Sequence, residues 1–184
     1  ALPILNTLRS DAQALDSLWI SVITFDREIK EIAPLTELVS FQLPEITCPQ
    51  SGPTNMGEAL LFLCDKVTTE VKKGTPTQKG DWKPLLFIMT DGSPSDIGLF
   101  KEAVPKIKSM NFGAVVACAA GPKAKDEYLK ELTSTVVHLD TADNATLKQF
   151  FKWVSDTIEM GNKSHGTGET VSLPEPPAEL HLVI

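Results

Sequence analysis

Oxygen-bearing side chains follow an apolar run near the middle of the sequence. Residues 85–89 read Leu-Leu-Phe-Ile-Met, and the next three, 90–92, read Thr-Asp-Gly. Ligands of open α/β sheets collect outside the carboxyl ends of the strands, so Asp91 is expected at such an edge. A second loop, residues 50–58, carries the Thr54 hydroxyl into a predicted helix. A hydroxyl and a carboxylate on two such loops suit a hard cation bound through oxygen, such as Mg²⁺.

Both residues also have an ordinary structural interpretation. An Asp before a Gly after a strand is a frequent turn residue, and Thr54 has the chemistry of a helix N-cap. Asn55 and Glu58 have the spacing of a capping box, which would leave the Thr54 hydroxyl for another partner. Taken by themselves, the two loops leave the cation site and the structural interpretation open.

The elements that would position these loops alternate between strand and helix. Charged residues on the strand at 28–32 place it at a sheet edge, antiparallel to the strand before it. The alternation predicts a doubly wound α/β fold with a mostly parallel sheet, helices on both faces and one antiparallel edge strand. The predicted elements are a helix at 3–15, strands at 18–25 and 28–32, a loop at 34–53, a helix at 55–71, a strand at 85–89, a helix from 93 that Pro105 kinks or shortens, a strand at 112–119, a helix at 125–133, a strand at 136–139 and a helix at 147–158.

Composition restricts the function classes. The 184 residues carry a net charge of −7, which argues against binding to nucleic acid or to an anionic membrane. The chain has no apolar run near the roughly 20 residues that cross a bilayer. Cys48, Cys64 and Cys118 form no Cys-x-x-Cys pair, and the last two lie in apolar contexts typical of core residues. We therefore expect a cytoplasmic protein.

The remaining functional side chains have simpler structural roles. His138 lies in the middle of a predicted strand and is expected to be a hydrogen-bonded structural residue, and His181 is expected in solvent. Trp19, Trp82 and Trp153 lie on or beside predicted elements and are expected in the core. No serine has the setting of a nucleophile elbow, and no phosphate-binding loop is present.

The domain is expected to span residues 1–160. From 161 to 184 the sequence is rich in Gly, Ser and Pro and has no helical period, which is typical of a tail. Its last residues, 179–184, are apolar enough to add a strand to a sheet edge.

Two runs resemble the second and third metal loops of a von Willebrand factor A domain: residues 51–57 and residues 90–96. Several segments, in the same order, resemble the TerY proteins of bacterial tellurium-resistance gene clusters, and they lie at 21–28, 79–96, 116–125, 150–155 and in the Pro-rich tail. The resemblance implies a metal-ion-dependent adhesion site (MIDAS) at the carboxyl edge of the sheet. Thr54 and Asp91 would there bind a divalent cation, Mg²⁺ or alternatively Mn²⁺ or Ca²⁺.

The sequence departs from that family at its start. The Asp-x-Ser-x-Ser loop that should precede the helix at 3–15 is absent, together with the strand before it. That strand would be central, between the strands at 18–25 and 85–89. We expect its absence to leave two buried, unpaired strand edges. An upstream segment, the tail at 179–184 or a neighbouring chain would have to fill the gap.

The resemblance implies a non-enzymatic protein-interaction domain of a tellurium-resistance and stress-response system. Its partner would present an Asp or Glu to the cation, and candidates are a co-encoded kinase, a phosphatase or another tellurium-resistance protein. One alternative is a phosphoryl-transfer enzyme or receiver with Asp91 as the phosphorylated carboxylate. Another is a structural scaffold with a degenerate metal site.

Overall fold

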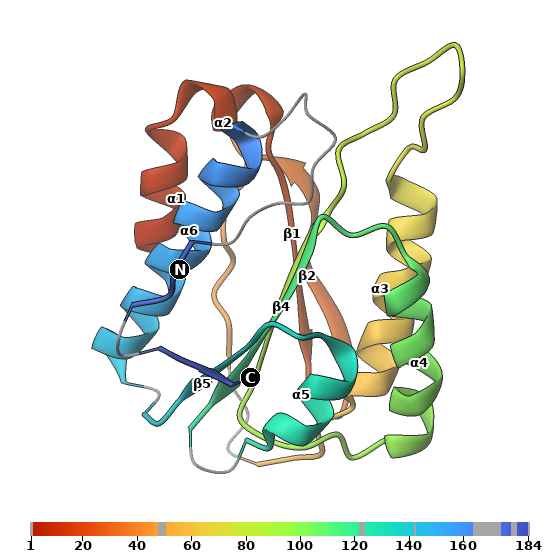
Figure 1. The fold of residues 1–184 in the computed structure, drawn as a ribbon, viewed down its shortest axis with the longest axis vertical. Helices are drawn as coiled ribbons and strands as arrows, with labels where there is room; N and C mark the ends of the chain where they lie inside the picture. Colours follow the sequence, from red (N-terminus) through yellow and green to blue (C-terminus); the bar gives the residue numbers. More distant parts are fainter. Residues whose placement is uncertain are drawn as a thin grey trace.

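The computed structural model describes residues 2–47, 51–121, 124–141, 143–163, 174–177 and 180–183. Its strands lie between two layers of helices (Figure 1). The helices are α1 Leu2–Arg9, α2 Ala12–Ser17, α3 Met56–Glu70, α4 Ile97–Ser109, α5 Asp126–Leu132 and α6 Asn144–Lys163. The strands are β1 Trp19–Phe25, β2 Ile29–Glu37, β3 Leu85–Thr90, β4 Ala114–Ala120, β5 Val136–Leu139 and β6 His181–Val183.

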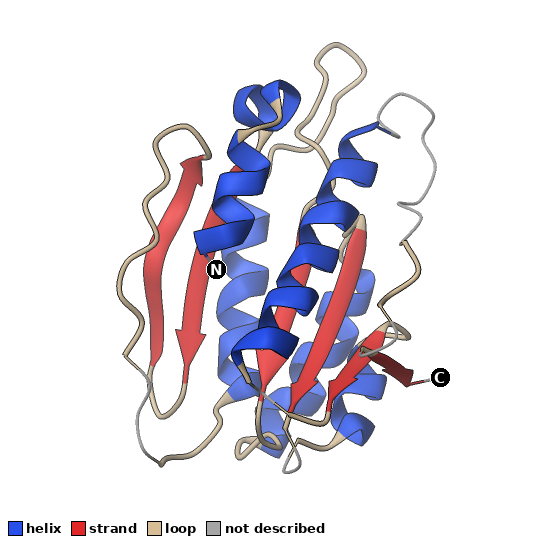
Figure 2. Ribbon diagram, turned by 90° about the vertical axis from the view of Figure 1, so that its left-hand side faces the viewer, coloured by secondary structure: helices blue, strands red, loops and turns tan. Residues whose placement is uncertain are grey.

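The strands form two separate sheets (Figure 2). In the larger sheet the order is β3-β4-β5-β6; β3, β4 and β5 run parallel, and β6 is antiparallel to β5. The smaller sheet is the antiparallel pair β1-β2. Helices α1, α2 and α6 lie on one side of the strands, and α3, α4 and α5 lie on the other (Figure 1). This is the predicted doubly wound α/β architecture, with its antiparallel pair at β1 and β2.

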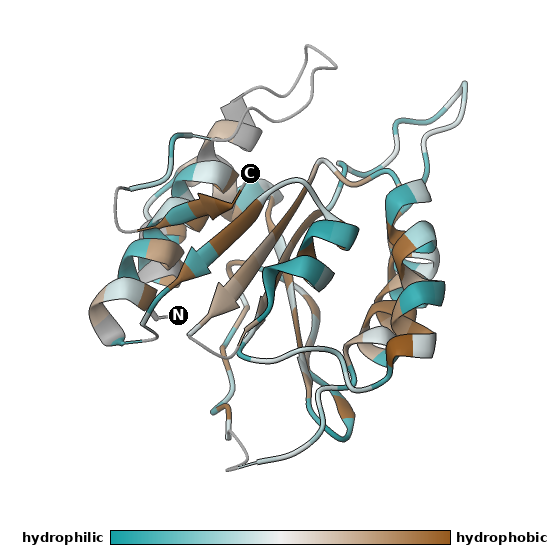
Figure 3. Ribbon diagram, turned by 60° about the horizontal axis from the view of Figure 1, so that its bottom comes forward, coloured by the Kyte–Doolittle hydropathy of each residue, from teal (hydrophilic) through white to brown (hydrophobic). Residues whose placement is uncertain are grey.

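Alternating side chains of the larger sheet build a core on each face. Ala117 and Ala119 of β4 pack on the side of α3, α4 and α5, whereas Val116 and Cys118 pack against α6. The period of two follows from the pleat of a strand. Figure 3 shows the result: hydrophobic colour is concentrated on the strands, and the outer helix α5 is hydrophilic. A strand apolar on both faces is typical of a parallel sheet covered by helices.

A third core lies under the first two helices. Leu5 and Leu8 of α1 pack with Ala33 of β2 and with Phe41, all of them buried. The predicted single helix at 3–15 is wrong, because the chain breaks into α1 and α2. Asp11 explains the break, since its side chain accepts a hydrogen bond from the backbone N–H of Ala14 (3.3 Å) and so starts a new helix.

Other element boundaries also differ from the prediction; helix α4, for example, begins at Ile97 rather than at 93, and α6 spans Asn144–Lys163 rather than 147–158. Strand β2 continues to Glu37, past the predicted end at residue 32 and into the predicted loop. Pro105 lies inside α4 without shortening it, since the helix continues to Ser109. Val104 and Ile107 on either side of this proline are buried, and their packing offsets the lost backbone hydrogen bond.

The C-terminal segment adds a strand to the far edge of the larger sheet, as predicted. Val183 pairs with Val136 and His181 pairs with His138 of β5. Since β4 and β5 separate β6 from β3, this segment does not lie between β1 and β3. The interpretation that the tail fills the central gap is therefore wrong for the described residues 180–183.

Candidate metal centre

A tight turn holds Asp91 at the carboxyl end of β3. Thr90 is buried, and its hydroxyl donates to the Gly92 carbonyl (3.2 Å) and accepts from the Gly92 N–H (3.2 Å). These two hydrogen bonds join the residues on either side of Asp91 in a tight turn, and the Asp91 side chain is exposed to solvent. The Asp91 carboxylate accepts no hydrogen bond from any described residue, so it is available to a ligand.

The loop before α3 lies against this turn. A Cβ placed on Gly92 would lie 3.1 Å from the Thr54 hydroxyl oxygen, so that oxygen touches the turn that carries Asp91. Two hydrogen bonds fix the contact: the Thr54 N–H donates to the Ser95 hydroxyl (2.8 Å), and the Ser95 N–H donates to the Thr54 carbonyl (2.8 Å). The structure thus brings the two predicted site residues, Thr54 and Asp91, to neighbouring loops at the carboxyl edge of the sheet.

Asp96 fastens the same two loops through the start of α3. Its two carboxylate oxygens accept hydrogen bonds from the backbone N–H groups of Gly57 (3.0 Å) and Glu58 (2.7 Å). The predicted capping box is wrong, because Asn55 makes no capping hydrogen bond with its side chain. Asp96 satisfies these helix N–H groups instead, which still leaves the Thr54 hydroxyl without a capping role.

Gly57 permits the close approach of the two helices. A Cβ on this residue would lie 2.1 Å from the backbone nitrogen of Phe100 in α4, a distance that real side chains do not reach. Glycine is therefore required where the first turns of α3 and α4 cross. This role of Gly57 was not predicted, because no local sequence pattern shows which helix packs against it.

Strand β1 ends at the same edge of the molecule, beside Asn55. The Asn55 N–H donates to the carbonyl of Asp26 (3.0 Å), and the Asn55 side chain donates to the carbonyl of Arg27 (3.2 Å). Strands β1 and β3 therefore end at one edge of the molecule, on either side of residues 54–55. Loops that follow strands ending at this edge are close enough to share a ligand.

The oxygen donors at this edge, the Thr54 hydroxyl and the Asp91 carboxylate, suit a hard cation but are few. Mg²⁺ prefers oxygen ligands and keeps several waters, which a hydroxyl and one carboxylate permit. Within the described ranges, however, no group of three or more His, Cys, Asp or Glu side chains could hold a metal ion. Thr54 and Asp91 therefore offer two oxygen donors, fewer than a complete cation site requires.

The spacing Asp-x-Ser-x-Ser does occur in the chain, at residues 91–95. It follows β3 rather than a strand ahead of α1. Ser95 uses its hydroxyl to accept from Thr54, so it serves to join the two loops.

The comparison with known families agrees with this architecture. Residues 4–153 match the von Willebrand factor type A domain. The chain belongs to that family. Von Willebrand factor type A domains are in general metal-dependent protein-interaction modules, and they commonly bind a divalent cation at a MIDAS. No curated protein and no solved structure matches the chain. Among the described helices, none has the length and apolar character needed to cross a bilayer.

Most other predicted side-chain roles in this von Willebrand factor type A domain are confirmed. His138 pairs with Asp126 (Nδ1 to Oδ1, 2.8 Å) as a structural residue, and His181 is 61% exposed. Cys64 and Cys118 are buried free thiols, and burial raises the pKa of Cys118 to about 12. Cys48 lies outside the described residues.

The tryptophans divide into two groups. Trp153 is buried, and its indole N–H donates to the Pro174 carbonyl (2.9 Å), as a core residue should. Trp19 and Trp82 are 52% and 44% exposed, so their predicted core positions are wrong. Both line a cavity between the two sheets, which explains their exposure.

Proposed function

We propose that this domain binds a protein partner through a divalent cation held by Thr54 and Asp91. The observation that carries the proposal is the contact of the Thr54 hydroxyl with the Asp91–Gly92 turn, at an edge where neither side chain has a hydrogen-bond partner among the described residues. The cation, Mg²⁺ or alternatively Mn²⁺ or Ca²⁺, would supply a Lewis-acidic position that accepts a carboxylate from the partner.

The chain's own residues would orient the two ligands. Ser95 and Asp96 tie the loop at 90–96 to the start of α3, so Thr54 and Asp91 keep their relative position before any cation binds. Such preorganisation reduces the entropy lost on binding. When the partner's carboxylate binds the cation, the position of the 90–96 loop would shift, and Asp96 would transmit this shift to α3.

The number of ligands sets the expected affinity. Two protein oxygens leave most of the coordination shell to water, so we expect weak cation binding by the 184 residues alone. A second Asp-x-Ser-x-Ser loop at this edge, besides the one at residues 91–95, would add oxygen ligands and tighten cation binding. The partner's Asp or Glu would act as one further ligand.

The biological setting of the proposal rests on sequence resemblance. The TerY-like segments favour a tellurium-resistance or stress-response role in the cytoplasm. The partner would then be a co-encoded kinase, a phosphatase or another protein of that system, and neither nucleic acid nor a membrane. We propose a binding role without catalysis, and 1–160 as the domain with 161–184 as its tail.

Calorimetric titration with Mg²⁺ and then with peptides tests the proposal. Each peptide carries one central Glu or, as its counterpart, Gln. We expect the Glu peptide to bind only with Mg²⁺ present, and Asp91→Ala to abolish that binding. Asp65→Asn, which changes an exposed carboxylate on α3, should leave it unchanged. Equal peptide binding in the presence of a chelator would overturn the proposal.

A further inference from the structure

The connection between α3 and β3 carries a concentration of positive charge. Residues 72–83 hold four of the 17 Lys and Arg residues of the chain but only one of its 24 Asp and Glu residues. We call this segment the lysine loop, and its lysines are Lys72, Lys73, Lys79 and Lys83. Because the loop is net positive, the remaining residues are more acidic than the net charge of −7 of the whole chain. The lysine loop is therefore a local electropositive surface on an acidic domain.

The lysine loop projects from the end of the domain that lies opposite the candidate metal centre (Figure 1). Helix α3 starts beside Thr54 and ends at Glu70, so its 15 residues, about 22 Å long, separate the two surfaces. Residues 72–79 and 81–83 are all exposed. A ligand bound to the lysine loop would thus leave the cation site accessible.

Hydrogen bonds hold the lysine loop in a hairpin conformation. At its tip, the Thr75 N–H donates to the Gln78 carbonyl (2.8 Å), and the Gln78 N–H donates to the Thr75 carbonyl (3.3 Å). At its base, the Asp81 N–H donates to the Lys72 carbonyl (2.9 Å), and the Asp81 carboxylate accepts from the Lys72 N–H (2.8 Å). The one carboxylate of the loop therefore closes the hairpin. The backbone that carries the lysines is preorganised, which reduces the entropy lost on binding.

Two glycines bring the arms of the hairpin into contact. A Cβ on Gly80 would lie 2.2 Å from the backbone nitrogen of Gly74, closer than real side chains approach. Glycine is therefore required where the arms cross. The arm that carries Lys72 and the arm that carries Lys79 consequently stay close together.

The amines of the lysine loop have no acidic partner among the described residues. Elsewhere in the domain, Lys30, Lys66 and Lys106 each pair with a glutamate. No carboxylate in the described part of the chain forms an ion pair with an amine of the lysine loop. The positive charge of the loop is therefore not compensated within the domain and attracts anionic groups from outside it.

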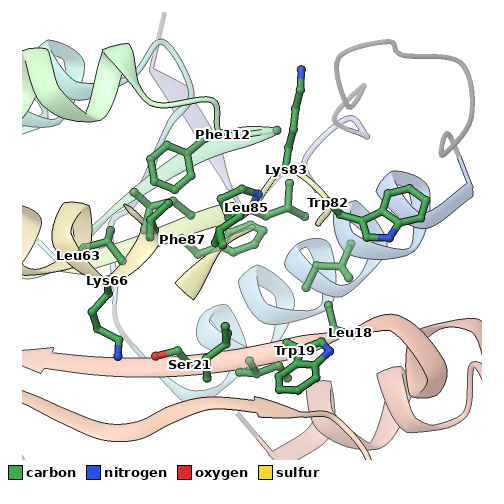
Figure 4. A pocket seen from close by; sticks show the side chains of 18 of the residues that line it. Leu18, Trp19, Ser21, Leu63, Lys66, Trp82, Lys83, Leu85, Phe87 and Phe112 are labelled. Atoms are coloured by element: carbon green, nitrogen blue, oxygen red, sulfur yellow. The ribbon is translucent and has the colours of Figure 1, made fainter. Parts of the chain in front are cut away.

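Two of these lysine side chains have defined surroundings. Among the residues that line the cavity between the two sheets, Lys83 extends away from Phe87 (Figure 4). The Lys79 amine lies over the ring of Trp82, 5.2 Å from the ring centroid. This cation–π contact covers one face of the ring, so that face is closed to a stacked nucleobase.

We infer that the lysine loop docks an acidic, extended segment of a protein partner. The four ammonium groups would face several Asp or Glu side chains, and a lysine suits a single carboxylate because it acts as a point charge. A nucleic acid fits less well, because its charged backbone would continue beyond the loop onto the acidic remainder of the domain. The covered face of the Trp82 ring also disfavours base stacking. This docking is separate from cation-mediated binding at Thr54 and Asp91.

Fluorescence anisotropy with the 184-residue chain tests this inference. The probe is a labelled twelve-residue peptide in which Glu and Ser alternate, and its counterpart carries Gln in place of Glu. Chelator is present throughout, so that the cation site plays no part. We expect only the Glu peptide to bind, and its affinity to fall as the ionic strength rises from about 0.02 M to about 0.15 M.

A matched pair of variants locates the binding. The loop variant combines Lys72→Gln, Lys73→Gln, Lys79→Gln and Lys83→Gln, and the control variant combines Lys101→Gln, Lys125→Gln, Lys148→Gln and Lys152→Gln. All eight lysines are exposed, so both variants should fold, and circular dichroism checks this. At about 0.15 M ionic strength, charges more than about 8 Å apart are largely screened. We therefore expect the loop variant to bind the Glu peptide about tenfold more weakly, and the control variant to bind it like the unaltered chain.

Four results would overturn the inference. The first is equal binding of the Gln peptide, which would exclude charge complementarity. The second is an equal loss of affinity in both variants, which would mean that net charge and not the lysine loop attracts the peptide. The third is tighter binding of a twelve-nucleotide single-stranded DNA that is lost in the loop variant, which would make the loop a nucleic-acid surface. The fourth is the absence of Glu-peptide binding at low ionic strength.

Discussion

Asp96, the residue immediately before α4, accepts a 3.0 Å hydrogen bond from the backbone N–H of Gly57 in the first turn of α3. The two residues are 39 positions apart in the sequence. This contact holds the two loops of the candidate metal centre together, and it places the N-terminus of α3 next to a carboxylate, where the helix dipole favours negative charge.

Replacing Asp96 should destabilise the fold. Asp96→Ala removes both acceptors from the first turn of α3, and loss of such a cap costs about 1–2 kcal/mol. Urea unfolding measures the change. Asp65→Ala, on an exposed face of α3, should stay within about 0.5 kcal/mol of the unaltered protein. Equal stability of the two variants would show that Asp96 is not a cap in solution.

Two glycine substitutions should have different effects on the stability of the fold. Gly57→Ala places a methyl group 2.1 Å from the backbone of Phe100, and we expect a loss of about 1–3 kcal/mol as α3 and α4 separate. Gly98→Ala has no atom within 4 Å of the new methyl group and lies in the first turn of α4, so it should be neutral or slightly stabilising. Thermal melts of the pair check this, and a neutral Gly57→Ala would contradict the predicted close approach.

Gly92→Ala should affect the cation site more than the fold. The added methyl group would meet the Thr54 hydroxyl at 3.1 Å and displace it from the Asp91 turn. We expect weaker Mn²⁺ binding, with a melting temperature close to that of the unaltered protein. Gly52→Ala, which has no neighbour within 4 Å, is the matched control. Similar Mn²⁺ affinity in both variants would argue against Thr54 as a ligand.

Cys118 should make stability depend on alkaline pH. Burial raises the pKa of its thiol from 9.0 to about 12, so the folded state keeps the proton when the unfolded state has lost it. The stabilising contribution is complete below pH 9, and it is lost as the pH rises from 9 toward 12. Urea unfolding between pH 8 and about pH 11 should show a steeper loss for the unaltered protein than for Cys118→Ala. Parallel curves would contradict the assigned burial of the thiol.

Local patterns predicted the regular elements well. The strand at 136–139 was predicted with its observed bounds, and β3 with one residue missing, because burial on both faces gives continuous apolar runs. The break between α1 and α2 was not predicted, since the apolar period continues through it and only the cap of Asp11 interrupts the helix.

The geometry of the candidate site was predictable in part. The proximity of Thr54 and the Asp91 turn could be predicted because each follows a recognisable loop pattern, and the strand order places those loops at one edge. The cap by Asp96 could not be, because it joins residues 38 and 39 positions apart and competes with a plausible local capping box at Asn55. Exposure of Trp19 and Trp82 depends on the cavity between the two sheets, which no local sequence pattern predicts.

The central claim is that Thr54 and Asp91 hold one divalent cation. Paramagnetic broadening of backbone amide signals by Mn²⁺ in the 184-residue chain tests it most directly. We predict broadening confined to residues 53–57 and 90–96, reversal by excess Mg²⁺, and its loss in Asp91→Asn but not in Asp65→Asn. Broadening that centres elsewhere, or that persists unchanged in Asp91→Asn, would contradict the claim.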